Sequence, residues 1–328
     1  MQIHLKSLSF YAYHGVLPQE REVGGRYLVD LSATVSDRRA HEALCHDRLE
    51  ATVNYADIYQ TVCDEMAQPS ALLEHVAGRM ARALLAKFSE IEEVALTVTK
   101  CEPPIAGFAG QGAAVSYRLR RRLIVWDFDG TLADTSGGIV QTMQATFRRC
   151  GLPLPSPEAV RQTIGLPLPE SIARLGGLEG KPLDEAVATY RELFEEIGTR
   201  NVQLFPGIAE ALRRHTEAGH LQAIATSRGH LSVEQLCEKL GIRHHFHYIV
   251  ACEDVACHKP DPTPVLVLAR MAGVSPADVE VIGDTTFDIE MGRRARAGAC
   301  TGVAWGNHST QRLLTAGADF VAEKAESL

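Results

Sequence analysis

Residues 123–132 read Leu-Ile-Val-Trp-Asp-Phe-Asp-Gly-Thr-Leu, and this stretch decides the fold of the larger part of the chain. Its first four residues form a continuous apolar run, which is typical of a strand buried on both faces of a sheet. Asp127 and Asp129 follow directly, at the strand end where open α/β sheets bind their ligands. Because alternate strand residues point to the same face, both carboxylates can reach one centre. Gly130 permits a sharp turn after them.

Three further polar groups follow in chain order. Thr226-Ser227-Arg228 comes after the apolar run 221–225, then comes Lys259-Pro260-Asp261-Pro262, and Gly283-Asp284-Thr285-Thr286-Phe287-Asp288 follows the run 279–282. Strand and helix patterns alternate from residue 123 to the C-terminus, which predicts an α/β domain with a Rossmann-like sheet. Four such signals in this order form a specific combination, although each alone would be weak.

Residues 122–328 closely resemble the haloacid-dehalogenase superfamily of phosphatases, in its phosphoglycolate-phosphatase-like branch. The resemblance implies that Asp127 is the nucleophile that takes the phosphoryl group. It implies that Asp129 protonates the leaving alcohol and then activates water. Thr226, with Ser227 beside it, and Lys259 are implied to hold the transferring phosphoryl oxygens.

The same resemblance implies a Mg²⁺ site formed by Asp127, Asp284 and the backbone carbonyl of Asp129, with Asp288 supporting it from nearby. Oxygen ligands are what this hard cation prefers. Phosphoryl transfer depends mainly on positioning and on neutralisation of charge, which Mg²⁺ and Lys259 can supply. In the alternative interpretation these acids are only solvated loop residues. This alternative has little support for the acids taken together and more support for Asp288 alone.

The long segment between the first two motifs contains helical patterns at 139–150 and 183–198. Its length fits an inserted helical cap at about 137–205 that closes over the site and excludes water. The loop Thr163-Ile164-Gly165-Leu166-Pro167 lies where related enzymes place specificity contacts, and core packing explains it equally well.

The first 120 residues have a different pattern. Alternating apolar and polar residues predict strands at 3–10, 27–35, 94–99 and 113–119, the first two joined by a turn around Gly24 and Gly25. Apolar residues at three- and four-residue spacing predict helices at 55–66 and 72–88. The order is ββααββ, which indicates an α+β domain at 1–120 joined without a Pro/Gly/Ser linker to a second domain at 121–328.

The first segment resembles dihydroneopterin aldolase across its whole length. The matching residues are Phe10-Tyr11-Ala12-Tyr13-His14-Gly15-Val16 with Glu20, Thr52-Val53-Asn54-Tyr55, Leu72-Leu73-Glu74-His75, and Thr97-Val98-Thr99-Lys100 with Pro103-Pro104-Ile105. This resemblance implies the tunnelling fold, a homo-oligomer (tetramer or octamer) with sites between subunits, and a retro-aldol cleavage that needs no metal or other cofactor. Epimerisation of the same pterin side chain is a related outcome that the sequence leaves open.

By this resemblance Lys100 is the proton-transfer catalyst, Glu74 anchors the pterin, Glu20 orients water and substrate, and Tyr55 protonates the enol-like intermediate. A carboxylate suits the pterin edge because it can accept two parallel N–H bonds. A lysine amine needs a lowered pKa to act as a base near neutrality. Plain alternatives are a surface charge for Lys100, a helix N-terminal acid for Glu74, and a hydrogen-bonded turn residue for His14.

Composition narrows the partners and the compartment. The net charge of −8 argues against nucleic-acid binding, and the basic run 118–122 is read as a solvated junction. No apolar stretch approaches the ~20 residues of a membrane span, and no signal peptide is expected, so we expect a cytoplasmic protein without a membrane partner. The eight cysteines lack CxxC pairs and are expected to be reduced; the groups Cys252, Cys257, His258 and His244, His245, His247 lack the paired spacing of a zinc site.

The two resemblances together predict a bifunctional enzyme of folate biosynthesis that acts on small pterin and phosphate ester substrates. The phosphatase would remove phosphate from dihydroneopterin phosphate, and the aldolase would cleave the dihydroneopterin to 6-hydroxymethyl-7,8-dihydropterin and glycolaldehyde. In one alternative the phosphatase acts on an unrelated substrate such as phosphoglycolate. In another the N-terminal domain is a non-catalytic oligomerisation and pterin-binding module.

Overall fold

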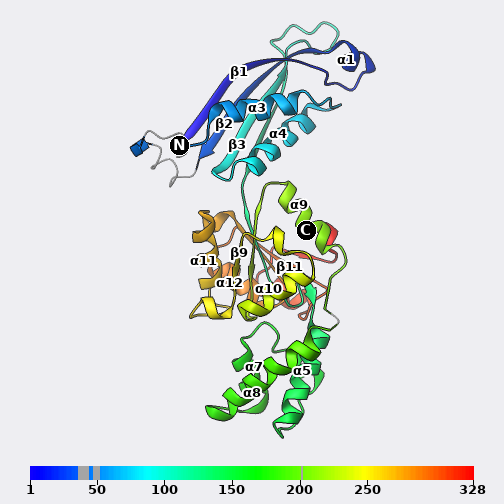
Figure 1. The fold of residues 1–328 in the computed structure, drawn as a ribbon. Helices are drawn as coiled ribbons and strands as arrows, with labels where there is room; N and C mark the ends of the chain where they lie inside the picture. The colour runs from blue at the N-terminus through cyan, green and yellow to red at the C-terminus, as the bar shows by residue number, and fades with distance from the viewer. Residues whose placement is uncertain (36–43, 47–51, 201) are drawn as a thin grey trace. The chain divides into compact units, whose positions relative to one another are not determined.

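The computed structural model describes residues 1–35, 44–46, 52–200 and 202–328. These residues form two compact units (Figure 1). The N-terminal unit comprises Met1–Arg121 with Glu217–His220, and the C-terminal unit comprises Arg122–Thr216 with Leu221–Leu328. No helix within these ranges combines the length and the apolarity needed to cross a lipid bilayer.

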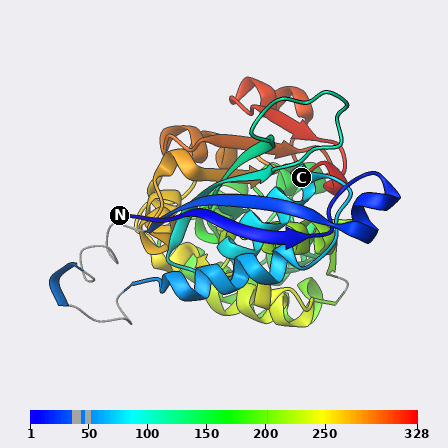
Figure 2. The same ribbon diagram turned by 90° about the horizontal axis from the view of Figure 1, so that it is seen from above.

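The N-terminal unit contains a four-stranded antiparallel sheet in the order β1-β2-β3-β4. The strands are β1 (Gln2–Ala12), β2 (Gly25–Val35), β3 (Ile91–Lys100) and β4 (Ala113–Arg120). β1 and β2, dark blue in Figure 2, run side by side as the predicted hairpin. Their connection carries a helix, α1 (Pro18–Val23), where only a turn was expected. Pro18 starts this helix and Glu20 caps it through the Leu17 amide, because Pro suits a first helical position and a carboxylate can accept from a free N–H there.

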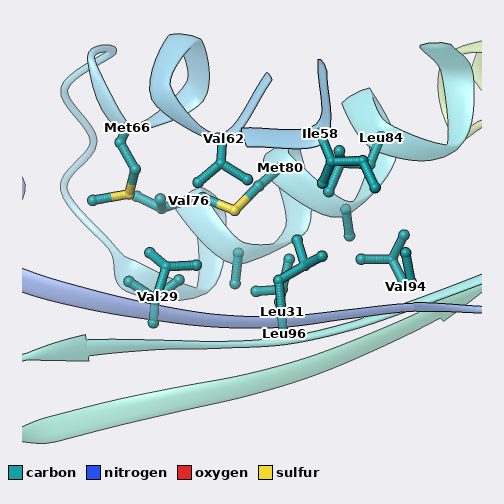
Figure 3. Close-up of a cluster of buried hydrophobic side chains, with 14 of the residues drawn as sticks. Val29, Leu31, Ile58, Val62, Met66, Val76, Met80, Leu84, Val94 and Leu96 are labelled. Carbon is teal, nitrogen blue, oxygen red and sulfur yellow. The ribbon is translucent and has the colours of Figure 1, made fainter. Parts of the chain in front are cut away.

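Two helices, α3 (Tyr55–Met66) and α4 (Leu73–Lys87), cover one face of this sheet. Figure 3 shows Val62 and Met80 from the helices pointing toward Leu31 and Leu96 of the strands. These side chains are buried because each helix has an apolar stripe at helical spacing and each strand places alternate residues on one face. The Asn54 side chain accepts from the Ala56 amide and so caps α3 at its start.

The C-terminal unit contains a six-stranded parallel sheet in the order β12-β11-β10-β5-β8-β9. The strands are β5 (Leu123–Trp126), β8 (Leu221–Ala225), β9 (Tyr248–Val250), β10 (Val279–Gly283), β11 (Ala299–Val303) and β12 (Phe320–Ala322). Successive strands from β5 extend to one side and those from β10 extend to the other. The switch point between β5 and β10 is where open sheets of this kind bind ligands.

Helices cover both faces of the parallel sheet, so its central strand is buried throughout. Ile124 and Trp126 pack into an apolar cluster on one face, and Leu123 and Val125 pack into a second cluster on the other. This confirms the α/β interpretation of the apolar run. The α-helices are α9 (Ile208–Glu217), α10 (His230–Lys239), α11 (Thr263–Ala272), α12 (Thr286–Arg294) and α13 (Thr310–Thr315), with short 3₁₀ turns η3 (Arg243–His245), η4 (Cys252–Asp254), η5 (Pro276–Asp278) and η6 (Ala325–Ser327).

A helical insertion lies between two short strands, β6 (Ala133–Asp134) and β7 (Gln203–Leu204), which pair antiparallel. It comprises α5 (Ser136–Arg149), α6 (Pro157–Arg161), α7 (Leu168–Gly176), α8 (Lys181–Leu193) and the π-helix η2 (Phe194–Gly198). Its members share an apolar core that includes Phe147 and Ile172. The paired stems place both ends of the insertion beside the residues that follow β5.

Candidate active sites

Three buried carboxylates meet at the switch point of the parallel sheet. Asp127 follows β5, Asp284 follows β10, and Asp288 lies in the first turn of α12. One carboxylate oxygen from each lies within 4.8 Å of the others. Gly130 has φ +92°, and a Cβ there would collide with the Asp284 carboxylate, so the turn after Asp129 requires glycine.

Lys259 holds two of these carboxylates. Its Nζ lies 2.5 Å from Asp127 Oδ1 and 2.7 Å from Asp288 Oδ1. The other Asp288 oxygen accepts from the backbone amide and the hydroxyl of Thr285, at 3.0 and 2.6 Å. Both Asp288 oxygens therefore have protein donors, which fits the expected supporting role.

Burial and mutual repulsion shape the charges of this cluster. Burial raises the pKa of Asp127 well above its ordinary value, with Lys259 opposing and the two neighbouring carboxylates reinforcing the shift. Burial, and then Asp288, raise the pKa of Asp284 to about 7. Burial alone would lower the pKa of Lys259, but Asp127 and Asp288 raise it above its ordinary value.

The residues fit a divalent cation. Three buried carboxylates face one ammonium group, so the cluster carries excess negative charge when all are ionised. Mg²⁺ takes oxygen ligands and binds through one or two carboxylates. Asp127 and Asp284 offer such oxygens, and burial, with neighbouring carboxylates adding to it, raises the pKa of each. A bound cation would favour their ionised forms. In the described part of the chain, this is the group of side chains close enough to bind a metal, and it includes none of the cysteines or histidines weighed for zinc.

We expect Mg²⁺ to stabilise the C-terminal unit more at pH 8 than at pH 5.5. The pKa of Asp284 is raised by folding to about 7, so its stability contribution in the metal-free protein is present below about 4 and is lost as the pH rises through 7. Mg²⁺ would offset the resulting repulsion, by about 2.7 kcal/mol at a hundredfold excess over its Kd. Thermal unfolding followed by tryptophan fluorescence measures this, because both tryptophans, Trp126 and Trp305, lie in the C-terminal unit.

Asp284→Asn is the matched variant, and its Mg²⁺-dependent shift should be much smaller. A Mg²⁺ effect of equal size at both pH values, or one that persists in this variant, would contradict the expected ligand.

Asp129 lies beside this cluster, but its carboxylate is engaged differently. Arg228 donates to both of its oxygens, with Nε 3.1 Å from Oδ2 and the terminal nitrogen on Oδ1. The Thr135 hydroxyl donates to Oδ1 at 2.6 Å. Arg228 belongs to the Thr226-Ser227-Arg228 motif but was not predicted as a site residue, because sequence spacing does not show which acid an arginine reaches. Thr135, at the start of the insertion, carried no signal at all.

Asp284 is also held by residues that the sequence did not single out. The backbone and side-chain amides of Asn307 both donate to Asp284 Oδ2 at 2.7 Å. The Thr131 hydroxyl donates to Oδ1 at 3.4 Å. These bonds orient the carboxylate, and Asn307 lies in a loop after β11 that has no recognisable motif.

A cavity of about 690 Å³ opens between the end of the sheet and the helical insertion. Asp127, Asp129 and the tripeptide Thr226-Ser227-Arg228 are among the residues that line it. The loop 163–167 forms part of its wall, and the Ser227 hydroxyl donates to the Gly165 carbonyl at 2.6 Å. Thr226 and Ser227 therefore face the same cavity as the predicted specificity loop. Lys259, the third predicted phosphoryl-binding residue, is not among the lining residues and bonds to Asp127 and Asp288.

In the N-terminal unit, Lys100 and Glu20 form an ion pair although they are 80 residues apart. Lys100 Nζ also donates to the carbonyl of His14 at 3.1 Å, and it lies 5.6 Å from the centroid of the Tyr27 ring. Lys100 is 9% exposed, so the surface-charge alternative does not describe it. Gly15 has φ +157°, and a Cβ there would collide with Glu20.

These contacts set the charges of the pair. Burial alone would lower the pKa of Lys100, but hydrogen bonds to Glu20 and Tyr27 raise it above its ordinary value. The hydrogen bond to Lys100 lowers the pKa of Glu20. Lys100 is thus held as an ammonium, a proton donor rather than the base with a lowered pKa that general base catalysis would need.

Among the described residues, Tyr55 and Glu74 form no hydrogen bond or ion pair with Lys100 or Glu20. Tyr55 starts α3 and is 66% exposed, and Glu74 is exposed in the first turn of α4. The Gly15 amide donates to the Ser70 carbonyl at 2.9 Å, which ties the His14 turn to the segment that leads into α4. The described chain therefore pairs Lys100 with Glu20 but shows no bond from either to Tyr55 or Glu74.

His14, expected as a hydrogen-bonded turn residue, is hydrogen-bonded through its carbonyl but not through its ring. Its carbonyl accepts from the Tyr27 hydroxyl at 2.5 Å, but its buried ring nitrogens have no hydrogen-bond partner among the described residues. Burial, then Arg79 and Lys100, lower its pKa to about 4. The ring is thus a neutral imidazole packed edge-on against Tyr27.

Comparison with known families gives a match for each of the two units. The family described as Haloacid dehalogenase-like hydrolase matches residues 124–301, and the family described as Dihydroneopterin aldolase matches residues 3–118. The dihydroneopterin aldolase of Bacillus subtilis (strain 168) is 36% identical over 108 residues, which is 87% of that protein and 32% of this chain. The chain belongs to both families.

Relatives of the C-terminal unit of this two-family enzyme carry several names. The protein named Probable phosphatase IndB of Dickeya dadantii (strain 3937) is 34% identical over 198 residues, 59% of this chain and 86% of that protein. A phosphoglycolate phosphatase of Pseudomonas putida is 28% identical over 194 residues, 57% of this chain and 71% of that protein. A haloacid dehalogenase-like hydrolase from Bacteroides fragilis has a solved structure with a TM-score of 0.61 and 26% identity, covering 64% of this chain and 100% of that chain.

Both predicted resemblances are confirmed by these matches. The chain is a fusion of a carbon–carbon lyase domain of the dihydroneopterin aldolase family and a phosphoric monoester hydrolase domain of the haloacid-dehalogenase family. The parallel sheet of the second domain is confirmed as the fold of that family.

Proposed function

We propose that the C-terminal unit hydrolyses dihydroneopterin phosphate through a phospho-Asp127 intermediate and that the N-terminal unit then cleaves the dihydroneopterin to 6-hydroxymethyl-7,8-dihydropterin and glycolaldehyde. The observation that carries this proposal is the cavity of about 690 Å³ that Asp127 and Asp129 line. Phosphoglycolate is a small molecule, whereas ligand pockets of some 300–1,000 Å³ take drug-sized molecules, the size class of a pterin. The fusion to an aldolase of the matching pterin supplies the second support.

The chemistry would follow from the placement of the side chains. Asp127 attacks phosphorus while the bond to the leaving oxygen breaks, and Asp129 protonates that oxygen. Asp129 then takes a proton from water, whose oxygen attacks phosphorus and releases phosphate from Asp127. Thr226, the backbone amide of Ser227 and Lys259 would hold the phosphoryl oxygens, since the Ser227 hydroxyl already donates to Gly165. Mg²⁺ bound by Asp127, Asp284 and the Asp129 carbonyl would neutralise charge on the transferring group.

The organisation of the chain fits this scheme. We assign residues 1–120 to the aldolase domain and 121–328 to the phosphatase domain, with residues at about 137–205 forming a cap. The cap assignment rests on the helical insertion, which enters and leaves through β6 and β7 and forms one wall of the cavity. Such an element can exclude water from the reacting groups.

The substrate is tested by assaying phosphate and glycolaldehyde together, with dihydroneopterin phosphate and Mg²⁺. We expect kcat/KM for phosphate release from dihydroneopterin phosphate to exceed that from phosphoglycolate, and glycolaldehyde to follow after phosphate. Release no faster than from phosphoglycolate would favour the alternative, which draws support from relatives named phosphoglycolate phosphatase. Analysis of the pterin products also separates cleavage from epimerisation.

For the N-terminal unit we propose a tunnelling-fold ring, a tetramer or octamer, in which Tyr55 and Glu74 of one subunit complete the site around Lys100 and Glu20 of another. This is supported by the exposure of Tyr55 and Glu74 and by the free outer edges of β1 and β4 within the described sheet. Closing a sheet into a ring pairs such edges. In such a site Lys100 would deliver the proton that its ammonium form holds.

The Lys100→Ala variant is expected to lower kcat of the retro-aldol cleavage by roughly 10²–10⁴-fold, because it removes the group that moves the proton. Oligomer size, measured by light scattering, should not change. Lys87→Ala, at an exposed site on the end of α4, is the matched control and should retain activity. Unaltered cleavage in the Lys100 variant would instead support a non-catalytic pterin-binding module.

A further inference from the structure

Arg228 has no role in the reaction steps proposed above, although it contacts the proposed acid and base Asp129. Its guanidinium donates through Nε and one terminal nitrogen to the two oxygens of Asp129, and through the other terminal nitrogen to the Ser232 hydroxyl at 3.1 Å. The Arg228 side chain is 9% exposed and that of Asp129 is 15% exposed. A bidentate arginine–carboxylate pair that is largely removed from water is strong and fixes orientation.

The same guanidinium also contacts the helical insertion. Its central carbon lies 4.5 Å from the centroid of the Phe194 ring in η2, and 5.8 Å from the centroid of Phe128, which lies between the two aspartates in the sequence. Cations at this distance from an aromatic face are attracted to it. Arg228 therefore lies between one ring of the α/β sheet domain and one ring of the insertion.

A second contact from the same tripeptide strengthens this connection. Ser227 binds the Gly165 carbonyl in the loop that precedes α7, so adjacent residues after β8 hold the insertion at two points. Thr135, where the insertion begins, donates to Asp129 as well. The Asp129 carboxylate is thus held from the sheet side and from the insertion side at once.

We propose that Arg228 is a positioning residue that fixes the acid and base Asp129 against the leaving oxygen when the insertion is docked through Phe194. Asp129 Oδ1 accepts from Arg228 and Thr135, whereas Oδ2 accepts, among the described residues, only from Arg228 Nε and keeps a second lone pair for the proton that is delivered to the leaving oxygen. The proposal rests on the proposed role of Asp129 in phosphate ester hydrolysis. Asp129 and Ser232 each take one N–H from a different terminal nitrogen of Arg228, and the second N–H of each of these nitrogens is left over. The arginine can therefore keep its contacts with Asp129 and Ser232 when substrate enters the cavity. Asp127 and Lys259 do not depend on it, because Lys259 contacts Asp127 directly.

The test compares two substrates that differ in their need for an acid. The oxygen of an alkyl phosphate such as glycerol 3-phosphate must be protonated as it leaves, whereas p-nitrophenolate leaves readily without a proton. For each substrate, kcat/KM reports on the steps up to formation of the phosphoenzyme. We expect Arg228→Ala to lower kcat/KM about 10²-fold for the alkyl ester and less than about tenfold for p-nitrophenyl phosphate, in line with the size of general acid catalysis.

Asp129→Asn is the reference variant and should show the same bias toward p-nitrophenyl phosphate. The double variant should be no slower than Asp129→Asn alone, because residues that act as one unit are not additive. Arg228→Lys should recover part of the alkyl activity, since its single ammonium can hold one oxygen of Asp129. Phe194→Leu should show the same bias to a smaller extent.

Arg213→Ala is the matched control, because Arg213 makes the same bidentate contact with Glu210 on the exposed face of α9. This variant should leave kcat/KM unchanged for both substrates. Equal losses on both esters in Arg228→Ala would overturn the proposal and indicate phosphate binding instead. A biased Asp129→Asn with an unbiased Arg228→Ala would overturn this inference alone, and an unbiased Asp129→Asn would overturn the acid role of Asp129 and the inference with it. If Arg228→Ala does not fold, Arg228→Lys carries the same test.

Discussion

Asp127→Asn is expected to lower phosphate ester hydrolysis by roughly 10⁴-fold or more, because it removes the nucleophile that accepts the phosphoryl group. An amide is nearly the same shape as the carboxylate, so the packing around β5 should be preserved. The aldolase should retain its activity, because Lys100 and Glu20 lie in the other unit. Phosphate release and glycolaldehyde formation, measured on the same preparation with phosphate ester and with dihydroneopterin, check both expectations.

Asp184→Asn is the control for this change, since Asp184 is an exposed acid in the first turn of α8. It should retain both activities. Trapping of phosphate on the protein adds a second readout: the native chain should incorporate label from a phosphorylated substrate and Asp127→Asn should not. Labelling that persists in Asp127→Asn would place the nucleophile elsewhere and remove the basis of the proposed chemistry.

Lys259→Met should have the second large effect, on stability and on activity together. Lys259 bonds to Asp127 and Asp288, and both of its partners are buried. Removing one member of a buried ion pair leaves an uncompensated charge and costs about 3–5 kcal/mol of unfolding free energy. Phosphatase activity should fall by at least a hundredfold, because the charge that neutralises the phosphoryl oxygens is lost.

Denaturant unfolding followed by fluorescence of Trp126 and Trp305 measures the stability of the C-terminal unit. Lys324→Met, at an exposed lysine before the C-terminal 3₁₀ turn, should leave it unchanged. The loss in Lys259→Met should be larger at pH 8 than at pH 5.5, since protonation relieves repulsion among carboxylates whose pKa values are raised by burial. A stability equal to that of the native chain would show that the ion pairs contribute little.

Local sequence patterns were enough to predict most of the helices and strands. The apolar run 123–126 indicates a strand buried on both faces because solvent never reaches either side of it, and helical spacing at 55–66 predicts α3 with its observed bounds. The helix α1 was missed because it is short and amphipathic periodicity cannot reveal a helix of this length; its start depends on the cap by Glu20. Tunnelling-fold assembly stays a prediction, because it depends on other copies of the chain.

The sequence by itself determined that carboxylates would follow β5 and β10, because each apolar strand pattern and the acidic residues after it are consecutive in the chain. Only the tertiary structure decided which partners those carboxylates have. Arg228 reaches Asp129 across 99 positions, Asn307 reaches Asp284 across 23, and Lys100 reaches Glu20 across 80. The physical reason is that a hydrogen bond or an ion pair depends on distances of a few ångströms in space, and the order of strands in the sheet, not the order of residues in the chain, sets those distances.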